Sequence, residues 1–370
     1  MQPLSDLLVL DFSTLLPGPM ASLFLAEAGA RVVKVERPEG EDMRRYPPRL
    51  GDEAAPFAAL NRGKESLALD LKAAGAIERL RPLLARADIL IEQFRPGVMA
   101  RLGLGYAELK EAYPRLIYCS ISGYGQAGPR ANEAGHDINY QAIGGLLGQS
   151  LRRGGVAPQP PALVADIAGG SMPAVLNILL ALRERDRTGK GCHLDIAMTD
   201  AMACFAWYGL ATGQASGRYP AGGEGVLTGA SPRYRLYATG DGWFLAVGAL
   251  EEKFWATFCT AIGLEEPLRH DACDPDATGG RIAQIIAGQP AAHWRALLEP
   301  LDCCCTVVRS LDEAVADPHL TARGLFDRQV EEPSGRRMVS TPLPLAPVFR
   351  DAAPALRRSP AVGEHDGEGG

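Results

Sequence analysis

Residues 134–140, AGHDINY, bring four kinds of reactive side chain into one short segment. An imidazole, a carboxylate, an amide and a phenol stand there within five residues, at His136, Asp137, Asn139 and Tyr140. Imidazole exchanges protons near neutral pH, so His136 is a candidate general acid or base.

A second segment, residues 164–170, places Asp166 ahead of a Gly-Gly pair and a long apolar run. Aspartate is a favoured N-cap, which predicts that a helix begins at Asp166. The N–H groups of that helix end, at Gly169 and Gly170, would suit a developing oxyanion. His136 and Asp166 then form a candidate acid/base pair. The structural alternative is a buried, hydrogen-bonded histidine and an ordinary helix cap.

These segments follow an alternation of strands and helices that is typical of a parallel α/β sheet. Strands are predicted at residues 7–10, 31–36, 88–92, 116–122 and 192–197, and helices at 20–28, 76–85 and 106–112. We therefore expect a large Rossmann-like, doubly wound domain.

The glycine-rich phosphate loop of a dehydrogenase is absent, because residues 15–20 read LLPGPM between the first strand and helix. Basic side chains recur instead near the ends of predicted strands, at Arg37, Arg62, Lys64, Lys72, Arg95 and Arg101. Open α/β sheets bind ligands at strand ends, so these cations could hold phosphates, although a solvated surface charge is the alternative for each one.

A region rich in glycine and small polar residues, 215–231, predicts a crossing into a second domain. Residues 236–247 alternate as a hairpin does, and amphipathic helices are predicted at 251–262, 291–298 and 311–316. A proline-rich strip at 340–347 predicts an extended return arm. The expected division is a large domain over 1–214, a small α+β domain over 215–325 and a return arm over 326–370.

Composition narrows the class of protein. A net charge of −6 without a Lys/Arg cluster argues against a nucleic-acid partner. We expect no membrane span, because no apolar stretch reaches about 18 residues. The eight cysteines fit neither a zinc site nor a disulfide framework, and no metal-ligand cluster stands out. These features predict a reduced, cytoplasmic enzyme.

The chain resembles the family III CoA-transferases (the CaiB/BaiF family), and within that family most of all the α-methylacyl-CoA racemases. The motifs that carry the resemblance, in the family's order, are LDFS (10–13), PGP (17–19), VVKVERP (32–38), NRGK (61–64), LDLK (69–72), FRPGV (94–98), SGYGQ (122–126), GHDINY (135–140), ADIAGG (165–170), RTGKG (187–191) and GEH (363–365).

The resemblance implies two domains and an interlocked homodimer that binds an acyl-CoA thioester, with no cofactor beyond the CoA moiety of the substrate. It places CoA binding on Arg37, Leu69, Asp70, Leu71, Lys72, Arg95 and Arg101, with Gly135, Asp137, Ile138, Asn139 and Tyr140 as further candidates. The Gln93–Phe94 backbone is a weaker candidate.

For catalysis, the resemblance implies a racemase that moves a proton at the α-carbon of a 2-methyl-branched acyl-CoA, using His136, Asp166 and Glu251. The first alternative is a CoA-transferase in which Asp166 is the nucleophile, and the second is a CoA-binding protein without catalysis. Transferases usually carry tyrosine at the position of His136. One departure from the racemase pattern is the TGASPRY segment at 228–234, where Arg233 could reshape the wall that holds the acyl group.

Overall fold

The computed structural model describes residues 1–151, 159–349 and 356–367. The chain forms two compact units, each with its own sheet and hydrophobic core. The first unit comprises Met1–Gly144, Pro160–Cys204 and Pro318–Gly370, and the second comprises Gly145–Gln159 and Phe205–Asp317.

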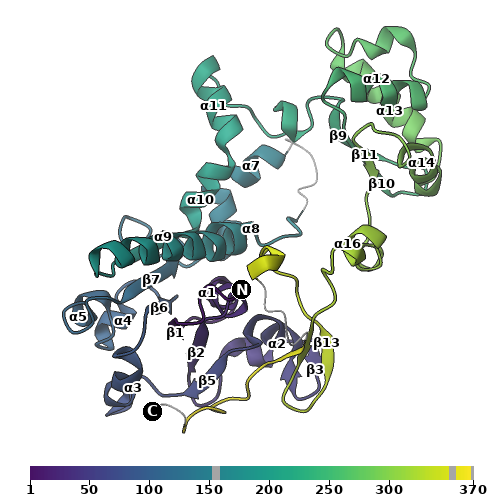
Figure 1. Ribbon diagram of the computed structural model, residues 1–370. Coiled ribbons are helices and arrows are strands. Elements are labelled where there is room, and N and C mark those ends of the chain that lie inside the picture. The colour runs from purple at the N-terminus through teal and green to yellow at the C-terminus, as the bar shows by residue number, and fades with distance from the viewer. Residues whose placement is uncertain (152–158, 350–355, 368–370) are drawn as a thin grey trace. The chain divides into compact units, whose positions relative to one another are not determined.

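A six-stranded parallel sheet forms the centre of the first unit, in the order β5-β2-β1-β6-β7-β8 (Figure 1). The strands are β1 (Leu8–Asp11), β2 (Arg31–Glu36), β5 (Glu65–Ala68), β6 (Ile89–Glu92), β7 (Ile117–Ser122) and β8 (His193–Ala197). Counted along the chain, this is the doubly wound order 3-2-1-4-5-6, which confirms the predicted fold. The order reverses between β1 and β6, and such sheets bind ligands outside the carboxyl ends of their strands at that point.

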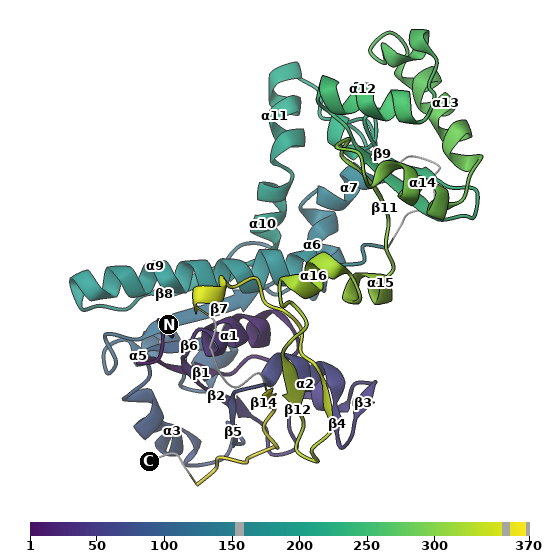
Figure 2. The same cartoon turned by 45° about the vertical axis from the view of Figure 1, so that its right-hand side comes forward.

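Helices cover both faces of this sheet. On one face α1 (Pro17–Glu27) contacts β1, β2 and β6, while α9 (Met172–Thr188) contacts β7 and β8 (Figure 2). The other face packs against α3 (Ala76–Leu84), α4 (Val98–Arg101) and α5 (Tyr106–Leu109) around Leu80, Leu104 and Tyr118. With both faces covered, the central strands are buried throughout, which explains their continuous apolar runs.

The shorter elements complete the first unit and lead out of it. They are η1 (Asp42–Arg45), β3 (Arg49–Leu50), β4 (Glu53–Ala54), α2 (Ala55–Asn61), α6 (Asp137–Ile143), α8 (Val164–Asp166), η2 (Ile167–Ser171), α10 (Met198–Phe205), α16 (Pro318–Ala322), β12 (Gln329–Glu331), β13 (Arg337–Val339), η5 (Pro347–Phe349) and β14 (Leu356–Arg358).

The helix that carries Asp166 differs from the prediction in two ways. It runs continuously from Val164 to Thr188 through α8, η2 and α9, so Asp166 lies inside it with helical dihedral angles and is not its N-cap. By length and composition this helix could also cross a membrane, contrary to the expected absence of such a stretch. Its inner side packs on α1, β7 and β8, as the core helix of an α/β unit does.

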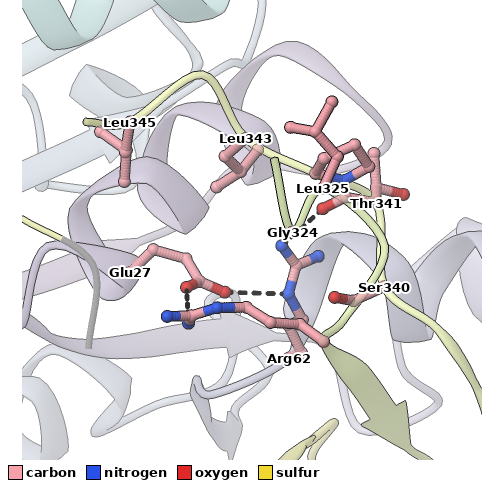
Figure 3. A pocket seen from close by; sticks show the side chains of 10 residues that line it. Glu27, Arg62, Gly324, Leu325, Ser340, Thr341, Leu343 and Leu345 are labelled. Carbon is pink, nitrogen blue, oxygen red and sulfur yellow. Dashed lines mark hydrogen bonds and ion pairs between the residues drawn. The ribbon is translucent and has the colours of Figure 1, made fainter. Parts of the chain in front are cut away.

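The C-terminal segment returns to the first unit through buried ion pairs (Figure 3). Glu27 accepts hydrogen bonds from Arg62 Nε and Arg328 Nη1, each at 3.0 Å. Arg62 Nη2 also donates to the Thr341 carbonyl at 2.9 Å, and Leu343 is buried beside α1 and α2. Arg62 therefore links α1 to the extended strip, and the pocket that it lines there, of about 20 Å³, has room for little more than a water molecule.

The second unit packs helices on a three-stranded antiparallel sheet of order β11-β10-β9, as expected for an α+β domain. Its core surrounds Trp255, Phe258 and Trp294. The elements are α7 (Leu146–Ser150), α11 (Trp207–Ser216), η3 (Val226–Thr228), β9 (Tyr234–Ala238), β10 (Phe244–Gly248), α12 (Glu252–Ala261), η4 (Glu266–Arg269), α13 (Pro275–Ala287), α14 (Ala291–Leu298), β11 (Cys305–Val307) and α15 (Leu311–Val315).

Candidate functional site: a cleft and an acid/base pair

A cleft of about 940 Å³ lies at the carboxyl ends of β1, β2, β5 and β6. Its lining brings together six of the residues that the resemblance assigned to CoA, and none of the further candidates at 135–140: Arg37, Leu69, Asp70, Leu71, Lys72 and Arg101. Phe12, Thr14 and Phe94 complete the wall where the strand order reverses. The ligand site of a doubly wound sheet is expected at this position.

The charges of the cleft are partly balanced within the protein. Arg37 forms an ion pair with Asp42 and donates from Nε to the Gly40 carbonyl at 2.7 Å. Both side chains of the ion pair are about half exposed, at 45% and 54%, so a phosphate could replace Asp42 as the partner of Arg37. The guanidinium groups of Arg45 and Arg37 hold the pKa of Asp42 below its usual range.

Three basic residues singled out in the sequence lie outside the cleft lining: Arg62, described above, Arg95 and Lys64. Arg95 is exposed but is not among the lining residues. The prediction that Lys64 could hold a phosphate is wrong, because its side chain is fully buried and its ammonium is paired with Asp11 at 3.2 Å. Lys64 also donates to the Pro19 carbonyl and to Asn61 Oδ1, at 2.9 and 2.8 Å.

The loop between β1 and α1 stands where a dehydrogenase has its phosphate loop. A second buried ion pair fixes it in place. Lys34 Nζ lies 3.0 Å from Glu41 and donates to the Ser13 carbonyl at 2.8 Å. Glu41 in turn accepts the N–H of Leu15 at 2.7 Å. Leu15 has φ of 61°, a conformation that costs a non-glycine residue free energy and persists only where its surroundings enforce it. The sequence reading overlooked Lys34 and Glu41, and a lysine inside an apolar strand was the signal that could have found them.

His136 and Asp166 lie near enough to each other to interact electrostatically. His136 is the exposed N-cap residue of α6, and its backbone N–H donates to Asn139 Oδ1 at 3.0 Å. Asp137, which is buried, accepts the backbone N–H of Asp166 at 2.9 Å. This bond joins α6 to the helix of Asp166, so two segments far apart in the sequence form one site.

The carboxyl group of Asp166 is poised for proton transfer. Burial and the neighbouring Asp137 carboxylate together raise its pKa to about 6, and His136 partly opposes both effects. A carboxyl group with such a pKa accepts and releases protons near neutral pH more readily than an ordinary aspartate. A one-turn π-helical segment starts directly after Asp166, and such segments are frequent at functional sites.

Tyr140 supports this site from the inside. Its side chain is buried, donates to the Gly135 carbonyl at 2.5 Å and packs edge-on against Tyr124. A Cβ at Gly135 would come within 2.7 Å of the Tyr140 ring, so only glycine fits there. Ile138, in contrast, is 41% exposed on the same helix.

The predicted oxyanion site at the Gly-Gly pair is wrong. Gly169 and Gly170 are buried inside the continuous helix, whose first residue is Val164. They allow close packing, because a Cβ on Gly169 would lie 2.9 Å from the Met198 carbonyl oxygen.

The third predicted catalytic residue, Glu251, belongs to the second unit and is the exposed N-cap of α12. A hollow of about 560 Å³ in the same unit is lined by Thr228, Gly229, Tyr234, Leu236 and neighbouring residues. Arg233 is not part of this lining and bonds Asp271 instead. Within the described ranges, no three His, Cys, Asp or Glu side chains are grouped to hold a metal ion.

Comparisons with known proteins agree with this geometry. A sequence profile of CoA-transferase family III matches residues 4–366. The chain is 38% identical to the alpha-methylacyl-CoA racemase of Mus musculus, over 96% of this chain and 90% of the relative. It is 33% identical to the acetyl-CoA:oxalate CoA-transferase of Acetobacter aceti, over 96% and 93%. The crystal structure of a CAIB/BAIF family protein from Brucella suis superposes with a TM-score of 0.82 at 30% identity, covering 99% and 98% of the two chains. The protein therefore belongs to CoA-transferase family III.

Proposed function

We propose that this protein is an acyl-CoA racemase that inverts the α-carbon of 2-methyl-branched acyl-CoA thioesters. The observation that carries the proposal is that His136 lies near enough to interact electrostatically with the Asp166 carboxyl group, whose pKa is raised to about 6. A racemase needs two groups that both exchange protons near neutral pH, and an imidazole and a perturbed carboxyl group meet that need.

In the proposed reaction one of the two groups removes the α-proton and the other delivers a proton to the opposite face of the resulting enolate. Each positioned acid or base contributes roughly 10²–10⁴-fold. Asp137 fixes the backbone of Asp166. Glu251 is proposed as the third catalytic residue, as the resemblance implies.

The CoA moiety is proposed to bind in the cleft of the first unit. Arg37, Lys72 and Arg101 supply positive charge there, and Phe94 and Leu69 supply apolar surface. No further cofactor is proposed. The chain is proposed to act as an interlocked homodimer, which light scattering would test directly.

The alternative is a CoA-transferase, and the identity to the Acetobacter aceti transferase favours it. Asp166 would then attack the thioester carbonyl and expel the CoA thiolate, forming a mixed anhydride. The thiolate would attack the aspartyl carbonyl, release the carboxylic acid and leave a CoA thioester on Asp166. An acceptor carboxylate would reverse these two steps and leave as the new CoA ester. Ping-pong kinetics are expected if the first carboxylic acid leaves before the acceptor binds.

One experiment separates these functions. Purified protein is incubated with a 2-methylacyl-CoA in D₂O and the α-hydrogen is followed by NMR, with Asp166→Asn as the control. Exchange in the wild type that the variant loses supports the racemase. A CoA thioester trapped on Asp166 without any exchange supports the transferase. Binding of CoA esters with neither event supports a CoA-binding protein without catalysis.

A further inference from the structure

Arg233 forms a clamp in the second unit that the proposed reaction does not yet use. Its Nη2 donates to Asp271 Oδ1 at 2.7 Å, and its Nε lies 3.0 Å from both oxygens of the same carboxylate. Its remaining nitrogen, Nη1, donates to the Leu250 carbonyl at 3.2 Å and to Glu252 Oε2 at 2.9 Å. The guanidinium also lies 4.8 Å from the centre of the Trp255 ring.

The backbone that carries Arg233 is fixed by hydrogen bonds. Arg233 directly precedes β9, its N–H donates to Ser231 Oγ at 3.1 Å, and Tyr237 donates to the Pro232 carbonyl at 2.8 Å. The side chain of Arg233 is 17% exposed and that of Asp271 is 12% exposed. A guanidinium forked onto a carboxylate in such a sheltered position is geometrically specific.

The clamp closes on both sides of one residue. Leu250 and Glu252, which Nη1 bonds, are the chain neighbours of Glu251. The Glu251 carbonyl accepts the N–H groups of Phe254 and Trp255, each at 3.0 Å, which fixes it to the first turn of α12. Among the described residues none bonds the Glu251 carboxylate, so its direction depends on the backbone that Arg233 and α12 hold.

We propose that Arg233 is a positioning residue that fixes Glu251 for its proposed catalytic role. This inference rests on the proposed function, because it needs Glu251 to act in the reaction. Lysine keeps the charge of arginine but is a point charge, so it cannot reach Asp271, the Leu250 carbonyl and Glu252 together. Arg233→Lys therefore releases the turn without removing the positive charge.

The test measures deuterium exchange from each enantiomer of a 2-methylacyl-CoA with wild type, Glu251→Gln and Arg233→Lys. Glu251→Gln identifies the enantiomer whose exchange depends on Glu251. Arg233→Lys is expected to slow that same enantiomer about tenfold or more and to leave the other within about twofold, because small displacements of a positioned group are costly.

A matched control is Arg281→Lys, since Arg281 forms a similar fork with Glu265 at 2.6–3.1 Å elsewhere in the second unit. It should leave both enantiomers unchanged. Backbone amide exchange of residues 250–255 should quicken in Arg233→Lys and not in this control. Should Arg233→Lys fail to fold, Asp271→Asn opens the same fork while keeping the shape of the acceptor.

The outcomes separate the clamp from the proposed function. If Glu251→Gln is one-sided but Arg233→Lys slows both enantiomers alike or neither, Arg233 is structural only and the clamp is overturned. If the wild type exchanges no α-hydrogen, or Glu251→Gln slows both enantiomers alike, the proposed role of Glu251 fails. The proposed positioning role of Arg233 then fails as well.

Discussion

Asp11 and Asp166 are two carboxyl groups of the first unit, one fully buried and the other partly buried, and they ionise very differently. Burial alone would raise the pKa of Asp11, but the ammonium groups of Lys64 and Lys34 and the hydroxyls of Ser13 and Ser22 lower it to about 2. Burial raises the pKa of Asp166 to about 6, and its nearest charged neighbours are another carboxylate and an imidazole.

The difference teaches what each carboxyl group can do. Asp11 is ionised throughout the physiological range, so it serves as an anchor for Lys64 beneath the loop that leads into α1. Asp166 can change its charge near neutral pH, which a general acid or base requires. The first unit therefore combines a fixed buried charge with a variable one.

A third carboxyl group shows that a raised pKa alone does not identify the site. Burial raises the pKa of Glu92 to about 7, even though bonds from Ser120 and the Phe94 N–H lower it. Glu92 is 4% exposed at the end of β6, so a substrate has little access to it. Asp166 differs because it is partly open to solvent and has His136 beside it.

The largest expected effect is a loss of stability when the buried charge of Asp11 loses its partner. Lys64→Met leaves Asp11 buried without its nearest cation, and breaking a buried pair costs about 3–5 kcal/mol. We expect a corresponding loss in the free energy of unfolding, measured by urea denaturation. Lys110→Met, at an exposed lysine, should change it by no more than about 0.5 kcal/mol. Equal effects of the two substitutions would contradict the anchoring role.

Asp166→Asn should remove activity but raise stability, whereas Lys64→Met should lower stability. Loss of the acid/base group should lower α-hydrogen exchange by at least about 10²-fold, or roughly 2.7 kcal/mol of barrier. The folded pKa of about 6 exceeds the ordinary 3.8, so the folded state holds the extra proton between these values and stability falls as pH rises through them.

The amide that replaces the carboxyl group in this variant carries no buried charge at any pH. We therefore expect Asp166→Asn to unfold at a higher temperature than wild type at pH 8 and at a similar temperature below about pH 4. Asp11→Asn should instead destabilise the protein at pH 8, because Lys64 and Lys34 lose their partner. Shifts of the same sign in both variants would remove the distinction between the two carboxyl groups.

His136→Ala tests whether His136 and Asp166 serve opposite faces of the α-carbon. Without the imidazole, one face of the α-carbon lacks its proton carrier while Asp166 still serves the other. Exchange from one enantiomer should fall at least about tenfold more than from the other. NMR in D₂O with each pure enantiomer measures this ratio. An equal loss for both would indicate general damage to the site.

The smallest effect is expected at the rim of the cleft. Arg37→Ala should raise the KM for CoA esters about tenfold with kcat nearly unchanged, since it removes binding that is uniform along the reaction. Arg95→Ala should raise it less, because Arg95 lies outside the cleft lining. Steady-state kinetics on both variants decide this, and a larger KM increase for Arg95→Ala would favour the sequence-based assignment.

The sequence by itself determined the fold and the family. Short runs rich in β-branched and aliphatic residues, such as 31–36 and 88–92, predict central strands, and the helices between them predict parallel neighbours. The motifs around His136 and Asp166 identified the two segments that the structure brings together. Local sequence is sufficient here because burial pattern and motif order are properties of the chain.

Only the tertiary structure decided what the charged side chains do. Lys64 and Arg62 stand in the same motif as strand-end cations, yet packing turns both inward onto carboxylates. Asp166 has the residue type of a helix cap, but α6 supplies Asp137 to accept its N–H and the helix starts before it. The direction of a long side chain and the ionisation of a carboxyl group depend on neighbours distant in the chain, which sequence spacing does not fix.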